Sequence, residues 1–322
     1  MELSCAFPPG PDTAAHVRIA EDLGYRRAWV YDSPALYGDV WAQLALCAVS
    51  TERIGLGPAV LVPSLRHPMV NAAAIAQLAD LAPGRVAVAI GTGFTGRFVM
   101  GQKPLTWSWV QTYLDQLIGL LRGETVEIDG KPCRMIHPDG YVAGRPVDVP
   151  ILVGANGPKG LAVAEAVGAA GVMSIFGGQP GWDWCALFGY GTVLEPGEAL
   201  DSERVMAAAG PGGAVVYHGM YEAGPELLAD FPGGPGWLAA IEEFPAAERH
   251  LHTHEQHFVG MTGRDRANVT GDLVAMTTWT GTPDDLRDRL AGAAAQGVSE
   301  FLYAPMGPDI ARELTAFRGL VD

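Results

Sequence analysis

Cysteine is scarce in this chain, and its spacing fits neither a disulfide framework nor a cysteine-rich metal site. The sequence has four cysteines in 322 residues, they are far apart, and no two form a C-x-x-C pair. Disulfide scaffolds and zinc modules both need cysteines at short, regular spacings. We therefore expect Cys5, Cys47, Cys133 and Cys185 to be small buried hydrophobic residues.

Basic residues and long apolar runs are also missing. The chain has 21 Lys and Arg against 36 Asp and Glu, for a net charge of −15, and no basic cluster. This balance argues against a nucleic-acid partner. No apolar run reaches the roughly 18–20 residues of a membrane span, and residues 3–7 lack the basic lead of a signal peptide. We expect a cytoplasmic protein with a small-molecule substrate, and a homodimer because that is the commonest oligomer.

What is present is an apolar fraction of 48% and a regular alternation of short apolar strands with helices. Strands that are apolar throughout and followed by a helix are typical of parallel β/α units. Such strands occur near residues 3, 29, 57, 88, 152, 173, 193 and 302, about eight in all. Eight is the number that closes a (β/α)8 TIM barrel, which we predict as a single domain over residues 1–322. A doubly wound open sheet is the alternative.

Two stretches interrupt the alternation. An insert around residues 124–147 begins with a polar hairpin that turns at Asp129-Gly130. Residues 177–274 are irregular, with Thr192–Leu194 as the best strand candidate. Beyond them Thr282-Pro283-Asp284-Asp285 predicts a helix start, because it combines a capping hydroxyl, a proline at the first helical position and two carboxylates.

Active sites of β/α barrels lie at the carboxyl ends of the strands, and here those ends are rich in glycine. The strand from Ile54 ends among Gly57, Pro58, Pro63 and Pro68, a pattern that suits the close approach of a flat ligand. Gly154–Lys159 leads into a helix whose free N–H groups could hold a phosphate, or it is a βα turn without a ligand. Asp32 follows the second strand, where it either accepts hydrogen bonds from a ligand or caps a turn.

Half of the eight histidines lie between residues 250 and 257. His254 and His257 form HExH, one residue short of the HExxH pattern of metalloproteases. On a helix, His250, His254 and His257 would share a face. We nevertheless expect no metal site, and we expect His254 to line the substrate pocket.

Taken in order, these residues resemble the luciferase-like superfamily of flavin- and deazaflavin-dependent oxidoreductases, closest to its methylenetetrahydromethanopterin reductase group. The resemblance covers nearly the whole chain. The segments that carry it are Ala28–Asp32, Gly57–Val60, Arg66–Pro68, Gly84–Val86, Gly91–Gly93, Gly154–Lys159 and Gly281–Asp285.

The resemblance implies a cofactor site at the strand ends. Ala59-Val60 would be a cis peptide that supports the ring of the cofactor, and Asp32 would hydrogen-bond the ring or its side chain. The phosphate region would lie over the glycine-rich turn. The implied cofactor-binding residues are Asp32, Ala59, Val60, Gly91, Thr92, Gly93, Gly154, Ala155, Asn156, Gly157 and Pro158.

Two departures from the family pattern bear on the chemistry. Ser33 stands where sugar-phosphate dehydrogenases of the family have a general-base His, and Phe94 stands where they have Glu. We therefore predict an F420-dependent oxidoreductase that transfers a hydride between the deazaflavin and a small, fairly apolar substrate, with His254 and Glu195 as catalytic candidates. The alternatives are an FMN-dependent monooxygenase that needs a reductase partner, and a non-catalytic flavin-binding barrel.

Overall fold

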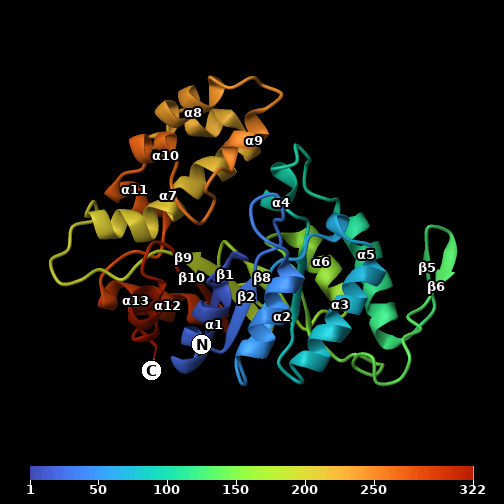
Figure 1. The fold of residues 1–322 in the computed structure, drawn as a ribbon. Helices are drawn as coiled ribbons and strands as arrows, with labels where there is room; N and C mark the ends of the chain where they lie inside the picture. Colours follow the sequence, from blue (N-terminus) through green and yellow to red (C-terminus); the bar gives the residue numbers. More distant parts are fainter. Residues whose placement is uncertain (322) are drawn as a thin grey trace.

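The computed structural model describes residues 1–321. Its main sheet has eight strands in the order β3-β2-β1-β10-β9-β8-β7-β4, and every neighbouring pair is parallel. The predicted barrel of eight parallel strands is confirmed (Figure 1). The strands are β1 (Glu2–Phe7), β2 (Arg27–Val30), β3 (Gly55–Pro58), β4 (Val88–Gly91), β7 (Ile151–Gly154), β8 (Gly171–Ser174), β9 (Cys185–Tyr190) and β10 (Glu300–Ala304).

Contacts between the two edge strands bring the sheet round into a barrel. Leu56 of β3 forms a parallel bridge with Val86, and Leu61, just after β3, forms one with Ile90 of β4. The two strands lie very close together here, because a Cβ on Gly57 would lie 1.9 Å from the backbone oxygen of Ala87, the residue before β4. Glycine is therefore required at position 57.

The barrel interior is filled mainly by small side chains and is closed at its amino end. Glu300, at the start of β10, is 3% exposed and accepts hydrogen bonds from the indole N–H groups of Trp29 (3.0 Å) and Trp184 (2.7 Å). Trp29 and Glu300 are buried and Trp184 is partly buried, and together they close the amino end of the barrel interior. The other inward-facing buried residues are Ala6, Ala87, Ala89, Leu152, Met173, Ala186, Leu302 and Ala304.

A layer of helices covers the outside of the barrel. The helix predicted to start at Thr282 does so through a reciprocal capping box with Asp285. No helix described in residues 1–321 is long and apolar enough to cross a membrane. The layer comprises α1 (Thr13–Asp22), α2 (Val40–Ser50), α3 (Pro68–Leu81), α5 (Trp107–Arg122), α6 (Pro158–Ala166), α12 (Pro283–Ala295) and α13 (Ile310–Arg318). The short helices η1 (Pro63–Leu65) and α4 (Thr95–Phe98) lie in the loops after β3 and β4, and α4 lies above the barrel (Figure 1).

The polar hairpin predicted after residue 124 is present as β5 (Val126–Ile128) and β6 (Lys131–Cys133), an antiparallel pair. It projects from the side of the barrel (Figure 1). Asp129 (φ 51°) and Gly130 (φ 71°) form its turn with positive φ at both positions, as the sequence predicted.

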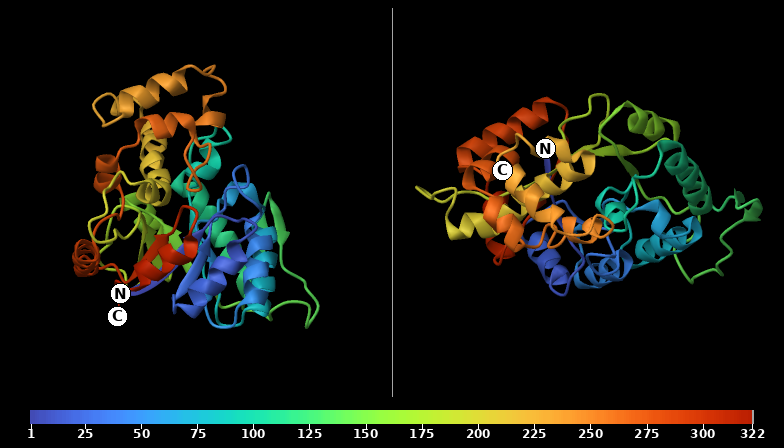
Figure 2. Two further views of the ribbon diagram at one scale, coloured as in Figure 1. Left: turned by 60° about the vertical axis from the view of Figure 1, so that its left-hand side comes forward. Right: turned by 90° about the horizontal axis from the view of Figure 1, so that it is seen from above.

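The second interruption contains helices that rise above the barrel, on the side away from both chain termini (Figures 1 and 2). The predicted strand Thr192–Leu194 was wrong: the seventh barrel strand is β9, and Val193 makes only an isolated bridge with Gly281. Ala186, Gly189 and the glycines before β9 have low β propensity, and for this reason the sequence pattern did not predict the strand. The helices are α7 (Glu203–Ala223), η2 (Pro225–Leu228), α8 (Gly234–Glu242), α9 (Arg249–Thr253), α10 (Gly263–Asn268) and α11 (Gly271–Thr277).

Helix α7 continues through a Gly-Pro-Gly-Gly run that locally argues for a break. Tertiary packing explains the small residues. A Cβ on Gly212 would lie 2.4 Å from the ring of Tyr190 in β9, and one on Gly210 would lie 2.7 Å from Met261. The helix is therefore held against the barrel mouth by contacts that are absent from its own sequence.

Candidate functional site

A small apolar platform lies where β3, β4 and β7 end. The Ala59-Val60 peptide bond is cis, as the resemblance implied, and both residues are partly exposed. A Cβ on Gly91 or on Gly154 would lie 3.0 Å and 2.9 Å, respectively, from a methyl carbon of Val60. Because neither glycine has a Cβ, the Val60 side chain lies across the ends of β4 and β7.

Asp32 ties the end of β2 to the loop after β3. Its side chain is almost fully buried, its Oδ2 accepts a hydrogen bond from the Val62 N–H at 3.0 Å, and both oxygens accept from Arg66 at 2.8 and 2.9 Å. Arg66 also pairs with Asp39 at 2.7 Å. Burial raises the pKa of the Asp32 carboxyl, and the Arg66 guanidinium opposes that rise. Within the protein, Asp32 therefore positions the segment that follows the platform.

The loop after β4 adds a second wall. Thr92 is buried, and Gly93 has φ +78°, which favours glycine. Phe94 and, beyond β8, Phe176 are 56% and 82% exposed. Neither phenyl ring is packed into the barrel mouth.

The glycine-rich turn after β7 leads directly into α6. Gly157 is the N-cap of this helix and has no side chain to occupy its free N–H groups, and Pro158 is the first helical residue. The Asn156 Oδ1 accepts hydrogen bonds from Ser174 Oγ (3.1 Å) and the Ile175 N–H (2.8 Å), which fixes the turn to the end of β8. Ala155, the residue before Asn156, is buried. The positive end of α6 is thus available for an anion beside the platform.

Aromatic side chains form the opposite side of the mouth. Phe258 lies in the segment after α9 and has φ 57°. Its ring centre lies 5.9 Å from that of Tyr31, 5.6 Å from that of Phe188 and 5.1 Å from that of Tyr190. The Tyr37 hydroxyl donates to the backbone oxygen of His257, which anchors the segment to the loop after β2.

The candidate catalytic residue His254 lies in a buried cluster with His218 and His257. It stacks on Phe98, and its Nε2 lies 3.4 Å from a carboxylate oxygen of Glu222. The cluster lies beside the loop after β4 rather than in the open mouth.

His250, His254 and His257 do not share a helix face. Helix α9 ends at Thr253, before His254, and His250 lies against Gly101 instead. The third member of the cluster is His218 of α7, which was not among the candidates predicted from the sequence. No signal in the sequence links position 218 to position 254, because the helix that carries His218 was itself not predicted.

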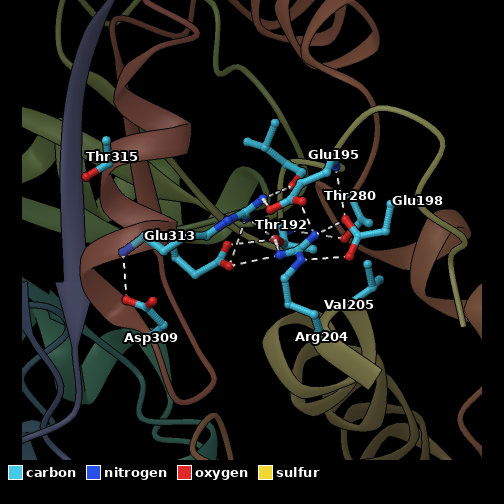
Figure 3. A network of polar contacts seen from close by, with 12 residues as sticks. Thr192, Glu195, Glu198, Arg204, Val205, Thr280, Asp309, Glu313 and Thr315 are labelled. Atoms are coloured by element: carbon cyan, nitrogen blue, oxygen red, sulfur yellow. Dashed lines mark hydrogen bonds and ion pairs between the residues drawn. The ribbon is translucent and has the colours of Figure 1, made fainter. Parts of the chain in front are cut away.

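The other catalytic candidate, Glu195, lies in a different network, shown in Figure 3. Its side chain is 62% exposed and lies 3.5 Å from Arg312 of α13. Arg204 of α7 is the centre of this network: it bonds Glu198, the buried Glu313 and Thr192. The hydrogen bond from Arg204 lowers the pKa of Glu198 to about 2. The network lies between the barrel wall and α13, so the structure does not bring Glu195 and His254 together.

Comparison with known proteins places these features in a family context. Residues 7–179 match the model of a family described as luciferase-like monooxygenase. A 5,10-methylenetetrahydromethanopterin reductase of Archaeoglobus fulgidus is 24% identical over 91% of this chain and 90% of its own length. An F420-dependent glucose-6-phosphate dehydrogenase of Beutenbergia cavernae is 36% identical over 49% of this chain and 50% of its own.

A similar fold occurs in a solved structure. The coenzyme F420-dependent tetrahydromethanopterin reductase of Methanopyrus kandleri superposes with a TM-score of 0.71 and 20% identity, over 99% of this chain and 98% of that one. At this identity the likeness concerns the fold, which extends through the helices above the barrel as well as the barrel itself.

Proposed function

The chain belongs to the luciferase-like monooxygenase family, and from that premise we propose that it is an oxidoreductase that uses the deazaflavin F420 to transfer a hydride to or from a small, fairly apolar organic substrate. Its relatives named above are an F420-dependent dehydrogenase and a methylenetetrahydromethanopterin reductase. Because the same family name includes monooxygenases, the cofactor has to be argued from the site as well.

The platform at Val60 is the observation that carries the proposal. Val60 lies across Gly91 and Gly154 at the carboxyl ends of three strands, which makes a flat apolar surface with backbone on either side. A tricyclic ring can rest one face on such a surface and leave the other face for the substrate. The residues present therefore fit a flavin-type or deazaflavin-type ring.

Each cofactor-binding candidate then has a physical role. Ala59 and Val60 would support the ring, and Thr92 and Gly93 would line its edge. The turn from Gly154 to Pro158 would hold the phosphate at the positive end of α6. Asp32 would act through Val62 and Arg66, by fixing the loop after the platform.

When bound, a deazaflavin supplies hydride chemistry, and the protein supplies position and exclusion of water. Tyr31, Phe188 and Phe258 line the side of the mouth that faces the platform. Their rings favour an apolar substrate and leave little room for water around it. Phe94 in place of a Glu adds to the apolar character of the same rim.

His254 and Glu195 remain our proposed catalytic candidates, and the contacts favour His254 as a residue that positions the aromatic side of the mouth. His254 is in the segment that carries Phe258, whereas Glu195 pairs with Arg312 of α13. On this proposal His254→Gln should lower kcat at saturating cofactor. An equal change in Glu195→Gln alone would transfer the role to Glu195.

Cofactor binding tests the proposal directly. The purified chain is titrated separately with F420 and with FMN, and quenching of its eight tryptophans is followed. We expect saturation by F420 and at least tenfold weaker binding of FMN. Preference for FMN, together with oxygen-dependent turnover, would identify a monooxygenase instead. Binding of neither cofactor would contradict the proposal.

We also propose that residues 1–322 form one domain, since Phe258 and α7 pack back onto the barrel strands. A homodimer and a cytoplasmic location stay predictions.

A further inference from the structure

Three histidines from two distant segments meet in the interior of the protein. His218 comes from α7, and His254 and His257 come from the segment after α9; their exposed fractions are 1%, 2% and 6%. One ring nitrogen from each lies within 4.8 Å of the other two. Isolated histidines are common in cores, but three converging imidazoles without a carboxylate between them need a physical explanation.

The distances agree with a tetrahedral metal site. The Nδ1 atom of His257 lies 3.0 Å from that of His218 and 3.4 Å from that of His254. Two nitrogens bound to zinc at about 2.0–2.1 Å with a tetrahedral angle are about 3.3–3.4 Å apart. The three ring centres are 5.1, 5.3 and 5.4 Å apart, and the same geometry predicts about 5.2 Å. The rings thus form a nearly equilateral triangle of the right size.

The outer nitrogens face groups that orient metal-bound histidines in other proteins. The Nε2 of His218 lies 3.7 Å from Asp265, and that of His254 lies 3.4 Å from Glu222. The Nε2 of His257 lies 3.3 Å from the Thr95 hydroxyl. Carboxylates and hydroxyls in this position accept the Nε2 hydrogen and leave the Nδ1 lone pair for a metal ion.

Hydrogen bonding alone does not satisfy this arrangement. The Nε2 atoms of His218 and His254 are buried without a hydrogen-bond partner, although each lies near a carboxylate, at 3.7 and 3.4 Å. If these nitrogens carry the imidazole hydrogens, the Nδ1 atoms of both residues are acceptors. His257 has one Nδ1 hydrogen at most and can donate it to one of them. Two Nδ1 lone pairs would then face each other in the protein interior without a hydrogen between them.

We propose that His218, His254 and His257 bind a divalent transition metal ion of the zinc class through their Nδ1 atoms. Three neutral imidazoles suit Zn²⁺, and also Co²⁺ as a spectroscopic substitute. The ion joins α7 to the segment that carries Phe258 and, through Thr95, lies beside the loop after β4. It holds the aromatic side of the barrel mouth in place. This site replaces the sequence-based expectation that the chain has no metal centre.

Metal binding in the absence of any cofactor tests the site. The untagged chain is stripped with a chelator, and its zinc content and affinity are measured after titration with ZnCl2. We expect one zinc per chain, and Co²⁺ should give the visible absorption of a tetrahedral site with nitrogen ligands. Each of His218→Gln, His254→Gln and His257→Gln should weaken zinc binding about 100-fold or more, whereas the neighbouring His250→Gln should bind as the wild type does.

A milder variant guards against simple misfolding. Glu222→Gln keeps all three ligands but removes the carboxylate behind His254, so zinc affinity should fall about 10- to 100-fold. Zinc should raise the melting temperature of the wild type and of His250→Gln, and should not raise that of His254→Gln. A wild type that binds no zinc, or ligand variants that all keep one zinc per chain, would show that the cluster is held by hydrogen bonds alone. Because these readouts need no F420, failure of the cofactor proposal would leave them unaffected.

Discussion

At the scale of the residue, the lack of a Cβ on Gly154 allows the Val60 side chain to form the platform. A Cβ on Gly154 would lie 2.9 Å from a Val60 methyl carbon, which is closer than side chains tolerate without movement. Gly154→Ala should displace Val60 and weaken F420 binding about tenfold or more, with a smaller effect on stability. The measurement is the tryptophan-quenching titration.

The matched control for that variant is Gly292→Ala in α12, where an added Cβ meets nothing within 4 Å. Its cofactor affinity should equal that of the wild type. If Gly154→Ala also kept the wild-type affinity, the cofactor ring would not rest on Val60.

Arg204 provides a second prediction at this scale. It satisfies the buried carboxylate of Glu313, which it shares with Arg312. Arg204→Met should lower the free energy of unfolding by about 1–3 kcal/mol, because Arg312 compensates only part of the lost charge. Arg287→Met removes an exposed pair with Asp284 and should change it by less than about 1 kcal/mol. Urea unfolding at neutral pH distinguishes the two, and equal effects would mean that the Glu313 network adds no more than a surface pair.

At the scale of the element, α7 depends on contacts outside itself. Two of its glycines differ in their surroundings: a Cβ on Gly212 would lie 2.4 Å from Tyr190, and one on Gly219 would meet nothing within 4 Å. Gly212→Ala should destabilise the protein by about 1–3 kcal/mol through overpacking. Gly219→Ala should stabilise it by about 0.5–1 kcal/mol through helix propensity.

Chemical denaturation of the two α7 variants checks both signs. If Gly212→Ala were as stable as Gly219→Ala, helix α7 would not be pressed against β9 in solution, and the position of His218 in its cluster would have to be revised.

At the scale of the whole molecule, stability should fall on acidification in two stages. The folded pKa values of His218 and His257 lie below the unfolded value, so as pH falls through about 6.5 the unfolded chain binds protons that the folded one does not. Stability that is present above pH 6.5 is therefore lost below it. Glu198, with a folded pKa of about 2, contributes a second loss as pH falls below about 4.

Thermal melting of the chelator-treated chain between pH 8 and pH 3.5 measures this dependence. The first stage should be smaller in His257→Gln and unchanged in His250→Gln. A stability that stayed level from pH 7.5 to pH 5.5 would indicate that the buried histidines protonate as readily in the folded state as in the unfolded chain.

The sequence by itself determined the barrel and the rim of strand ends at which we propose that the cofactor binds. Short apolar strands followed by helices are local patterns, and so are the capping box at Thr282 and the turn at Asp129-Gly130. Because parallel strands align their carboxyl ends, local strand positions sufficed to collect Val60, Gly91 and Gly154 at one rim.

Only the tertiary structure decided the rest, because the deciding contacts join residues distant in sequence. Strand β9 and helix α7 contradict their local propensities and are held by packing against each other. The partners of Asp32 come from the loop after β3. His218 and His254 belong to one cluster although they are far apart in the sequence. Spacing rules compare neighbours on one helix and cannot detect such a pairing, so the proposed metal site could not be predicted from the sequence.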